Sequence, residues 1–106
     1  MGTIDRKIEI EIIEGSGCEV HNIGQKYVYP NEIGNICPWL LDSIITMIRV
    51  LQFNGKLPWT YNGTKYEKIM DDELTTEYVR CPDPTSSGIV VKISCKKIDN
   101  INVGWC

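Results

Sequence analysis

The chain has 106 residues, with 11 basic and 14 acidic side chains and a formal net charge of −3 at pH 7. The charges are scattered and form no basic stripe, which disfavours a nucleic-acid partner. The apolar runs are too short for a membrane span, and charges interrupt the N-terminal stretch where a secretory signal would be apolar. We therefore expect a soluble, cytoplasmic protein with no membrane partner.

The first half of the chain predicts two strands and a helix. Residues 8–12 alternate isoleucine with glutamate, which is the period of a half-buried strand. Residues 26–29 (KYVY) favour a second short strand. Residues 38–53 are apolar except for polar side chains at helical spacing, which indicates one core helix with a narrow polar stripe: Asp42, Thr46, Arg49 and Gln52. Pro38 fits the first helical position and leaves Cys37 at or beside the N-cap.

The second half predicts a ribbon, a connection and a closing strand. Residues 58–69 carry Asn62-Gly63 between aromatic and polar flanks, a strong hairpin signal. Residues 71–77 (DDELTTE) are acidic and read as a surface connection, whereas 89–96 alternate as a strand with one buried face. These elements predict an α+β domain, a small curved antiparallel β-sheet packed on one long central helix.

We expect this domain to be the only one, spanning residues 1–106. Its ordered core should cover about residues 5–98, followed by a C-terminal tail over 99–106 that has no clear period. Cys95, on the apolar face of the closing strand, should be a core residue. The thiol of Cys106 falls in the tail and is expected to be incidental.

Cysteine and histidine supply the chemistry that stands out, because five cysteines are many for a reduced compartment. Four of these side chains fall at predicted turns or at the helix start, where the backbone can aim them inward: Cys18, His21, Cys37 and Cys81. Three thiolates and one imidazole are a standard tetrahedral set for zinc, and the spacing C-x2-H lets one loop supply two ligands. The sequence predicts a metal site at these four residues, with zinc favoured by the soft donors and iron as the alternative.

Two other readings of the same residues remain open. In a thiol enzyme or redox protein, Cys37 would be the reactive group, since a helix N-terminus stabilises a thiolate. His21 would then be its base, Asp42 or Asp83 an orienting carboxylate, and Cys18 or Cys81 a resolving thiol. In a partner-binding module the cysteines would only pack as small apolar residues.

The partner in that third reading is an unspecified small molecule or protein. A homodimer is a further expectation, because the exposed edge strands of a small sheet invite pairing. The aromatic residues Trp39, Trp59 and Tyr61 either line an apolar pocket near the thiols or contribute only to packing, and packing is the favoured interpretation.

Four short motifs occur in an order that resembles a family of short prokaryotic proteins of uncharacterised function. They cover roughly residues 5–98: Cys18 with His21, Gly34 to Trp39 (GNICPW), Phe53 to Trp59 (FNGKLPW) and Cys81 to Pro84 (CPDP). This chain has a shorter gap between cysteine and histidine than the family, Val20 where members tend to have glycine, and Asn54 in place of another glycine. The resemblance implies that the three cysteines and His21 belong to one set, and it implies no activity.

Overall fold

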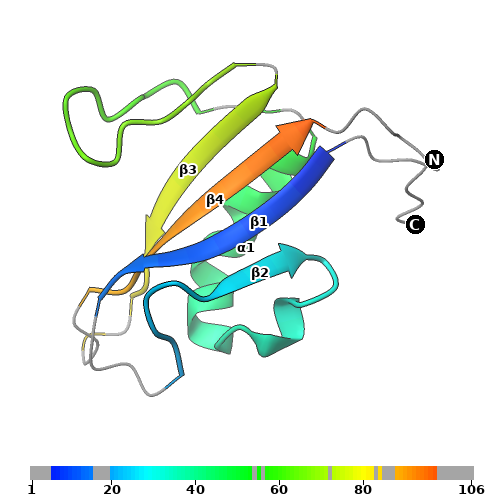
Figure 1. The fold of residues 1–106 in the computed structure, drawn as a ribbon, viewed down its shortest axis with the longest axis vertical. Helices are drawn as coiled ribbons and strands as arrows, with labels where there is room; N and C mark the ends of the chain where they lie inside the picture. The colour runs from blue at the N-terminus through cyan, green and yellow to red at the C-terminus, as the bar shows by residue number, and fades with distance from the viewer. Residues whose placement is uncertain are drawn as a thin grey trace.

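The computed structural model describes residues 6–15, 20–53, 55, 57–71, 73–82, 84 and 88–97. Its elements in chain order are β1 (Arg6–Glu14), β2 (Lys26–Tyr29), the 3-10 helix η1 (Ile33–Asn35), α1 (Pro38–Gln52), β3 (Leu74–Arg80) and β4 (Val90–Lys97). The strands form one antiparallel sheet in the order β2-β1-β4-β3, and α1 lies across one face (Figure 1). The predicted α+β architecture is confirmed.

The core lies between α1 and the two central strands. Alternate residues of β1 and β4 face the helix in register, with Ile8 opposite Cys95 and Ile10 opposite Ile93. The helix adds a buried stripe at spacings of four, four and three: Leu40, Ile44, Ile48 and Leu51. Burial of each large aliphatic side chain stabilises the fold by about 1.5–3 kcal/mol, so this layer fixes how α1 sits on the sheet. Cys95 is a core residue, as predicted.

The start of α1 follows the sequence prediction. Pro38 occupies the first turn, where its missing N–H costs no helical hydrogen bond, and Cys37 is the N-cap. The helix ends at Gln52, and the N–H of Phe53 donates to the carbonyl oxygen of Arg49 at 3.3 Å. Within the described ranges, no helix has both the length and the apolar character needed to span a membrane.

Two predicted elements are wrong, and they adjoin each other. Residues 71–77 are not a surface connection, because β3 begins at Leu74 and its Glu77 is buried. Residues 58–69, all of which are described, contain no strand, and the adjoining Met70 makes an isolated bridge to Thr75 of β3. Polar residues of β3 are buried, so its sequence lacks the apolar–polar alternation that predicts a strand. The free edge of β3 lies against the turn-rich segment 57–69, which we call the 57–69 loop.

Candidate functional site

The chemistry predicted from the sequence centres on His21, which is 2% exposed. Its Nε2 accepts a hydrogen bond from the backbone N–H of Cys37 at 3.0 Å, and its Nδ1 lies 3.0 Å from Oε1 of Gln25. Because Nε2 accepts, a neutral ring carries its proton on Nδ1 and donates it to Gln25. The ring of Tyr27 packs edge-on against the imidazole, with centroids 5.7 Å apart. We call these four residues the His21 corner.

The His21 corner brings together two of the four predicted metal ligands. His21 meets Cys37 at the N-cap of α1, and the half-buried Cys37 and Cys81 both pack against the hydrophobic core. Cys18 lies outside the described residues, so the four-ligand site stays a prediction. In the part of the chain that the structure describes, no three side chains of His, Cys, Asp or Glu gather closely enough to hold a metal ion.

The hydrogen bonds of His21 bear on both the metal and the thiol reading. The Nδ1 bond to Gln25 is the kind of outer contact that orients a metal-binding histidine, but Nε2 is already occupied by the Cys37 N–H. That bond goes to the backbone of Cys37 and not to its thiol, which makes no capping hydrogen bond at the helix start. In this arrangement the imidazole fixes the entry to α1. Asp83, the predicted orienting carboxylate, lies outside the described residues.

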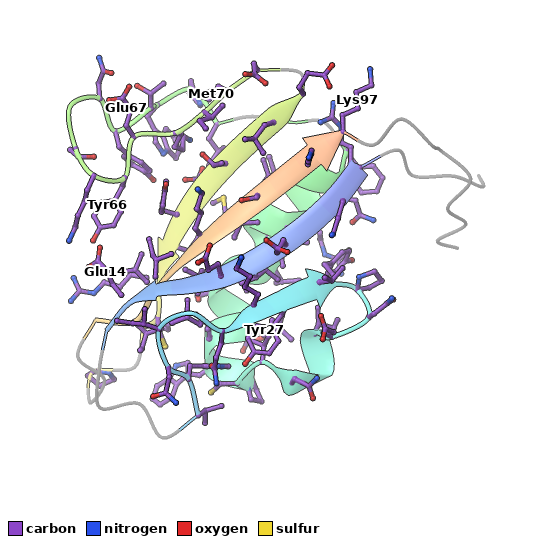
Figure 2. The ribbon with its side chains drawn as sticks, in the orientation of Figure 1. Glu14, Tyr27, Tyr66, Glu67, Met70 and Lys97 are labelled. Carbon is purple, nitrogen blue, oxygen red and sulfur yellow. The ribbon has the colours of Figure 1, made fainter. Side chains whose placement is uncertain are left out.

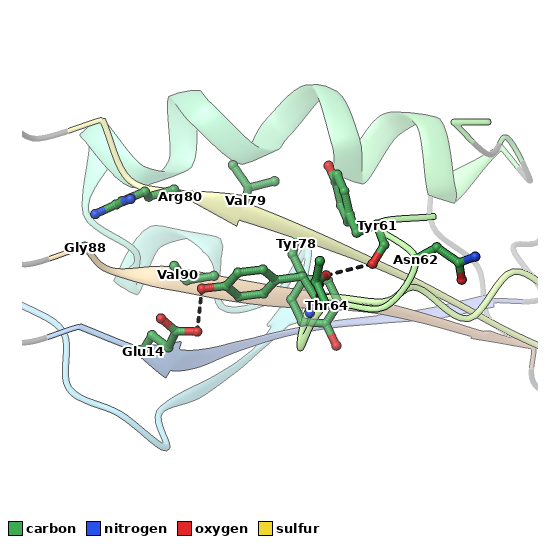
Figure 3. A pocket seen from close by; sticks show the side chains of 10 residues that line it. Glu14, Tyr61, Asn62, Thr64, Tyr78, Val79, Arg80, Gly88 and Val90 are labelled. Carbon is green, nitrogen blue, oxygen red and sulfur yellow. Dashed lines mark hydrogen bonds between the residues drawn. The ribbon is translucent and has the colours of Figure 1, made fainter. Parts of the chain in front are cut away.

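A pocket that the sequence did not predict lies at the opposite edge of the sheet, beside β3 (Figure 3). Its volume is about 450 Å³, within the range of small-molecule sites. Its walls come from the 57–69 loop and from the ends of β1, β3 and β4: Glu14, Tyr61, Asn62, Thr64, Tyr66, Tyr78, Val79, Arg80, Gly88 and Val90. We call it the tyrosine pocket.

The 57–69 loop that walls the pocket has a tip held by its own hydrogen bonds. Tyr61 and Gly63 have left-handed backbone, with φ of 56° and 79°, which glycine adopts without steric cost. Thr64 donates from its N–H and its Oγ1 to the carbonyl oxygen of Tyr61, at 3.1 and 2.7 Å. The N–H of Gly63 donates to the carboxylate of Glu67 at 3.2 Å. The predicted turn at Asn62-Gly63 therefore exists, although its flanks do not form strands.

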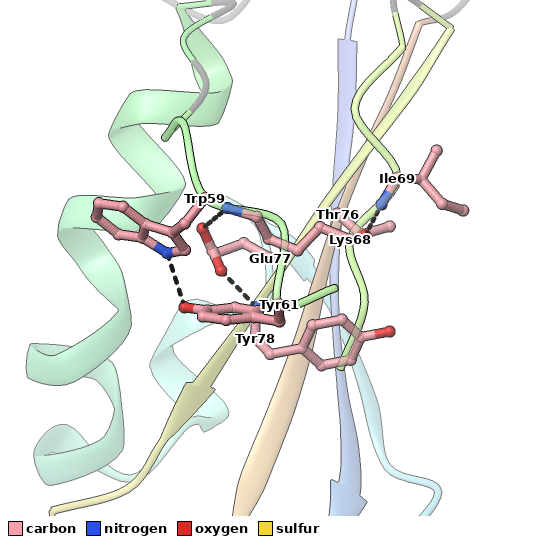
Figure 4. A network of polar contacts seen from close by, with 7 residues as sticks. All are labelled: Trp59, Tyr61, Lys68, Ile69, Thr76, Glu77 and Tyr78. Carbon is pink, nitrogen blue, oxygen red and sulfur yellow. Dashed lines mark hydrogen bonds and ion pairs between the residues drawn. The ribbon is translucent and has the colours of Figure 1, made fainter. Parts of the chain in front are cut away.

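A buried ion pair fastens this loop to β3 (Figure 4). Nζ of Lys68 lies 2.9 Å from Oε2 of Glu77, and the two side chains are only 2% and 5% exposed. The ammonium also lies 5.4 Å from the ring centroid of Trp59 and 5.3 Å from that of Tyr61, within cation–π range. The other carboxylate oxygen of Glu77 accepts from the N–H of Tyr78 at 3.0 Å. Each oxygen of this buried carboxylate has a donor.

A second, exposed contact fastens the tip of the loop to the end of β1. The hydroxyl of Tyr66 donates to Oε2 of Glu14 at 2.6 Å, and Nζ of Lys65 lies 2.9 Å from the same oxygen. These hydrogen bonds, that of Tyr66 first, hold the pKa of the Glu14 carboxyl below its usual value. The hydrogen bond to Glu14 raises the pKa of the Tyr66 phenol. Figure 2 shows Tyr66 and Glu14 on the β3 side of the molecule, away from Tyr27 of the His21 corner.

Arg80 lies at the end of β3 and of the pocket, and its side chain is exposed. Among the described residues its guanidinium has no hydrogen-bond or ion-pair partner. One of its nitrogens passes close over Gly88, where an added Cβ would lie 2.7 Å from Nη2. Gly88 has φ of 70°, so glycine suits both the backbone and the close approach.

Sequence reasoning missed most of the residues of the pocket. Of the three aromatic residues considered for an apolar pocket, Tyr61 lines this one, whereas Trp39 is 52% exposed at the start of α1. The repeated tyrosines at 61, 66 and 78 were the available signal, but their meeting depends on the path of the loop.

Comparison of the chain with models of known families, with curated proteins and with solved structures finds no match.

Proposed function

We propose that this protein is a binding domain whose ligand is a small organic molecule held in the tyrosine pocket. The observation that carries the proposal is a hollow of about 450 Å³ with aromatic walls and a few polar groups along them. Sites for small molecules commonly combine apolar walls with a small number of placed polar groups. The loop that forms one wall is held by a buried ion pair, so the wall stands without a ligand.

Binding accounts for this pocket better than acid–base catalysis does. A general acid or base works best when its pKa lies near the working pH. Glu14 and Tyr66 are the titratable pair in contact here, and their mutual hydrogen bond lowers the pKa of the carboxyl and raises that of the phenol. Both shifts lead away from neutrality, so Glu14 keeps its charge and Tyr66 its proton. The pair supports the wall.

A fragment screen on ¹⁵N-labelled protein tests the proposal. We expect fragments with an aromatic ring to shift the backbone amide signals of pocket residues such as Thr64, Gly88 and Val90. Truncation of an aromatic wall residue, Tyr61→Ala, should weaken these shifts. The matched control is Trp39→Ala, which removes an exposed aromatic side chain in the first turn of α1, outside the pocket lining, and should leave them unchanged.

The same screen can contradict the proposal in two ways. If no fragment in a diverse library shifts the pocket amides at millimolar concentration, the pocket is not a ligand site. If the hits shift amides around His21 and Cys37 instead, the binding surface lies at the His21 corner. Either result removes the tyrosine pocket as the functional site.

A further inference from the structure

We infer that the ligand of the tyrosine pocket is an aromatic carboxylic acid whose carboxylate binds the guanidinium of Arg80. This inference rests on the proposed function, and it adds the chemical class of the ligand. Three features of the pocket carry it: a cation with no ion-pair partner among the described residues, aromatic walls, and a neighbouring carboxylate whose charge is already compensated.

Among the described residues, the charges around the pocket leave one positive charge without a partner. Two of the described lining residues are charged, Glu14 and Arg80. Glu14 is neutralised from outside the lining by Lys65 and also accepts the hydroxyl of Tyr66, so both of these donors are committed to it. Arg80 attracts Glu14 only at longer range and makes no hydrogen bond among the described residues. An anionic ligand would complete this arrangement, because one guanidinium is then matched by one negative charge.

The walls favour an aromatic body. The rings of Tyr66 and Tyr78 lie 5.5 Å apart at an interplanar angle of 58°, and Tyr61 stands on the loop side of the pocket (Figure 3). Val79 and Val90 add aliphatic surface at the sheet. Aromatic rings prefer edge-to-face or offset contacts with one another, and tilted tyrosines offer both edges and faces to a flat ligand.

A carboxylate fits Arg80 better than a phosphate does. The planar guanidinium can donate two parallel N–H bonds to the two oxygens of a carboxylate. A phosphate carries up to two negative charges and usually draws on several donors, whereas Arg80 is the one uncommitted cation among the described residues that line the pocket.

A matched pair of probes tests the inference: 3-phenylpropionate and its neutral amide, 3-phenylpropionamide, with phenyl phosphate as the dianion. Binding is measured from the shifts of pocket amide signals during titration. We expect the acid to bind about tenfold more tightly than the amide, the scale of a charge-assisted hydrogen bond on a partly solvated site. The preference should disappear in Arg80→Gln and fall in Arg80→Lys, which keeps the charge but not the bidentate geometry.

The control for general electrostatics is Lys26→Gln, which removes a positive charge from β2 at the opposite edge of the sheet. It should leave the preference for the acid intact. Equal affinity for acid and amide at the pocket amides would overturn the inference while the proposed function stands. Tighter binding of phenyl phosphate, or a preference for the acid that survives in Arg80→Gln, would overturn it as well. Failure of the whole fragment library at the pocket would instead remove the proposed function.

Discussion

The His21 corner and the tyrosine pocket lie at opposite edges of one sheet and use their polar atoms differently. In the His21 corner both imidazole nitrogens have partners within the chain, at 3.0 Å each. In the pocket, the guanidinium of Arg80 has no such partner in the described residues. The histidine that the sequence marked as reactive is thus hydrogen-bonded within the chain, whereas Arg80 beside the pocket keeps donors that the proposed ligand could use.

Loss of the buried Lys68–Glu77 ion pair, which fastens the 57–69 loop beside the pocket, should have the largest effect on stability. Glu77→Ala leaves the ammonium of Lys68 buried without its counter-ion. We expect the free energy of unfolding to fall by about 3–5 kcal/mol, measured by urea denaturation. Replacing both partners by apolar residues, Lys68→Met with Glu77→Leu, should recover most of the loss. A single-variant loss below about 1 kcal/mol would mean that the pair does not hold the loop.

The exposed ion pair between Lys65 and Glu14 supplies the matched control for this experiment. Lys65→Met removes the ion pair with Glu14, whose side chains are 67% and 31% exposed. Solvent screens exposed pairs and leaves them little effect on stability, so this variant should unfold close to the wild type. The two variants together separate burial from charge as the cause of the effect.

Removal of the His21 imidazole tests whether the His21 corner stabilises the fold. His21→Ala leaves the Cys37 N–H without its acceptor at the start of α1 and opens a cavity under Tyr27. We expect a loss of about 2–4 kcal/mol in the free energy of unfolding. The nearby exposed side chain of Ile23 gives a control, since Ile23→Ala should change it by less than about 0.5 kcal/mol. Equal effects of the two substitutions would contradict the structural role of His21.

Metal analysis tests whether the predicted four-ligand site at the His21 corner holds a metal ion. Because Nε2 of His21 already accepts from Cys37, we expect a chelator to leave the thermal midpoint of the wild type unchanged. The measurement is a thermal melt with and without chelator, with metal content determined on protein purified without oxygen. Stoichiometric zinc or iron that is lost in both Cys37→Ser and Cys81→Ser would contradict this expectation and would establish the metal site, with Cys18 as the remaining ligand.

The sequence predicted the parts of the fold that repeat a simple period. The isoleucines of β1, the polar stripe of α1 and the proline that starts the helix all follow from local rules, and all are confirmed. β3 was missed because Glu77 is buried by pairing with Lys68, nine residues earlier in a loop. The pocket was missed for the same reason: its walls depend on where a long loop is fastened, and no local pattern encodes that.

The pH dependence of stability tests whether the exposed hydrogen bond between Tyr66 and Glu14 contributes to stability. Its expected effect is smaller than those of Glu77→Ala and His21→Ala. The folded protein holds the pKa of Glu14 below its ordinary value of 4.5, with the Tyr66 hydroxyl as the first cause. The stability from this contact is therefore present above the ordinary pKa and is lost as the pH falls through the folded pKa. We expect Tyr66→Phe to lose less of its thermal midpoint than the wild type between about pH 7 and about pH 3.5. Tyr78→Phe removes a phenol that does not contact Glu14, so it should behave as the wild type does. If the three proteins lose stability equally, the hydroxyl does not hold Glu14, and the wall of the pocket rests on the buried pair alone.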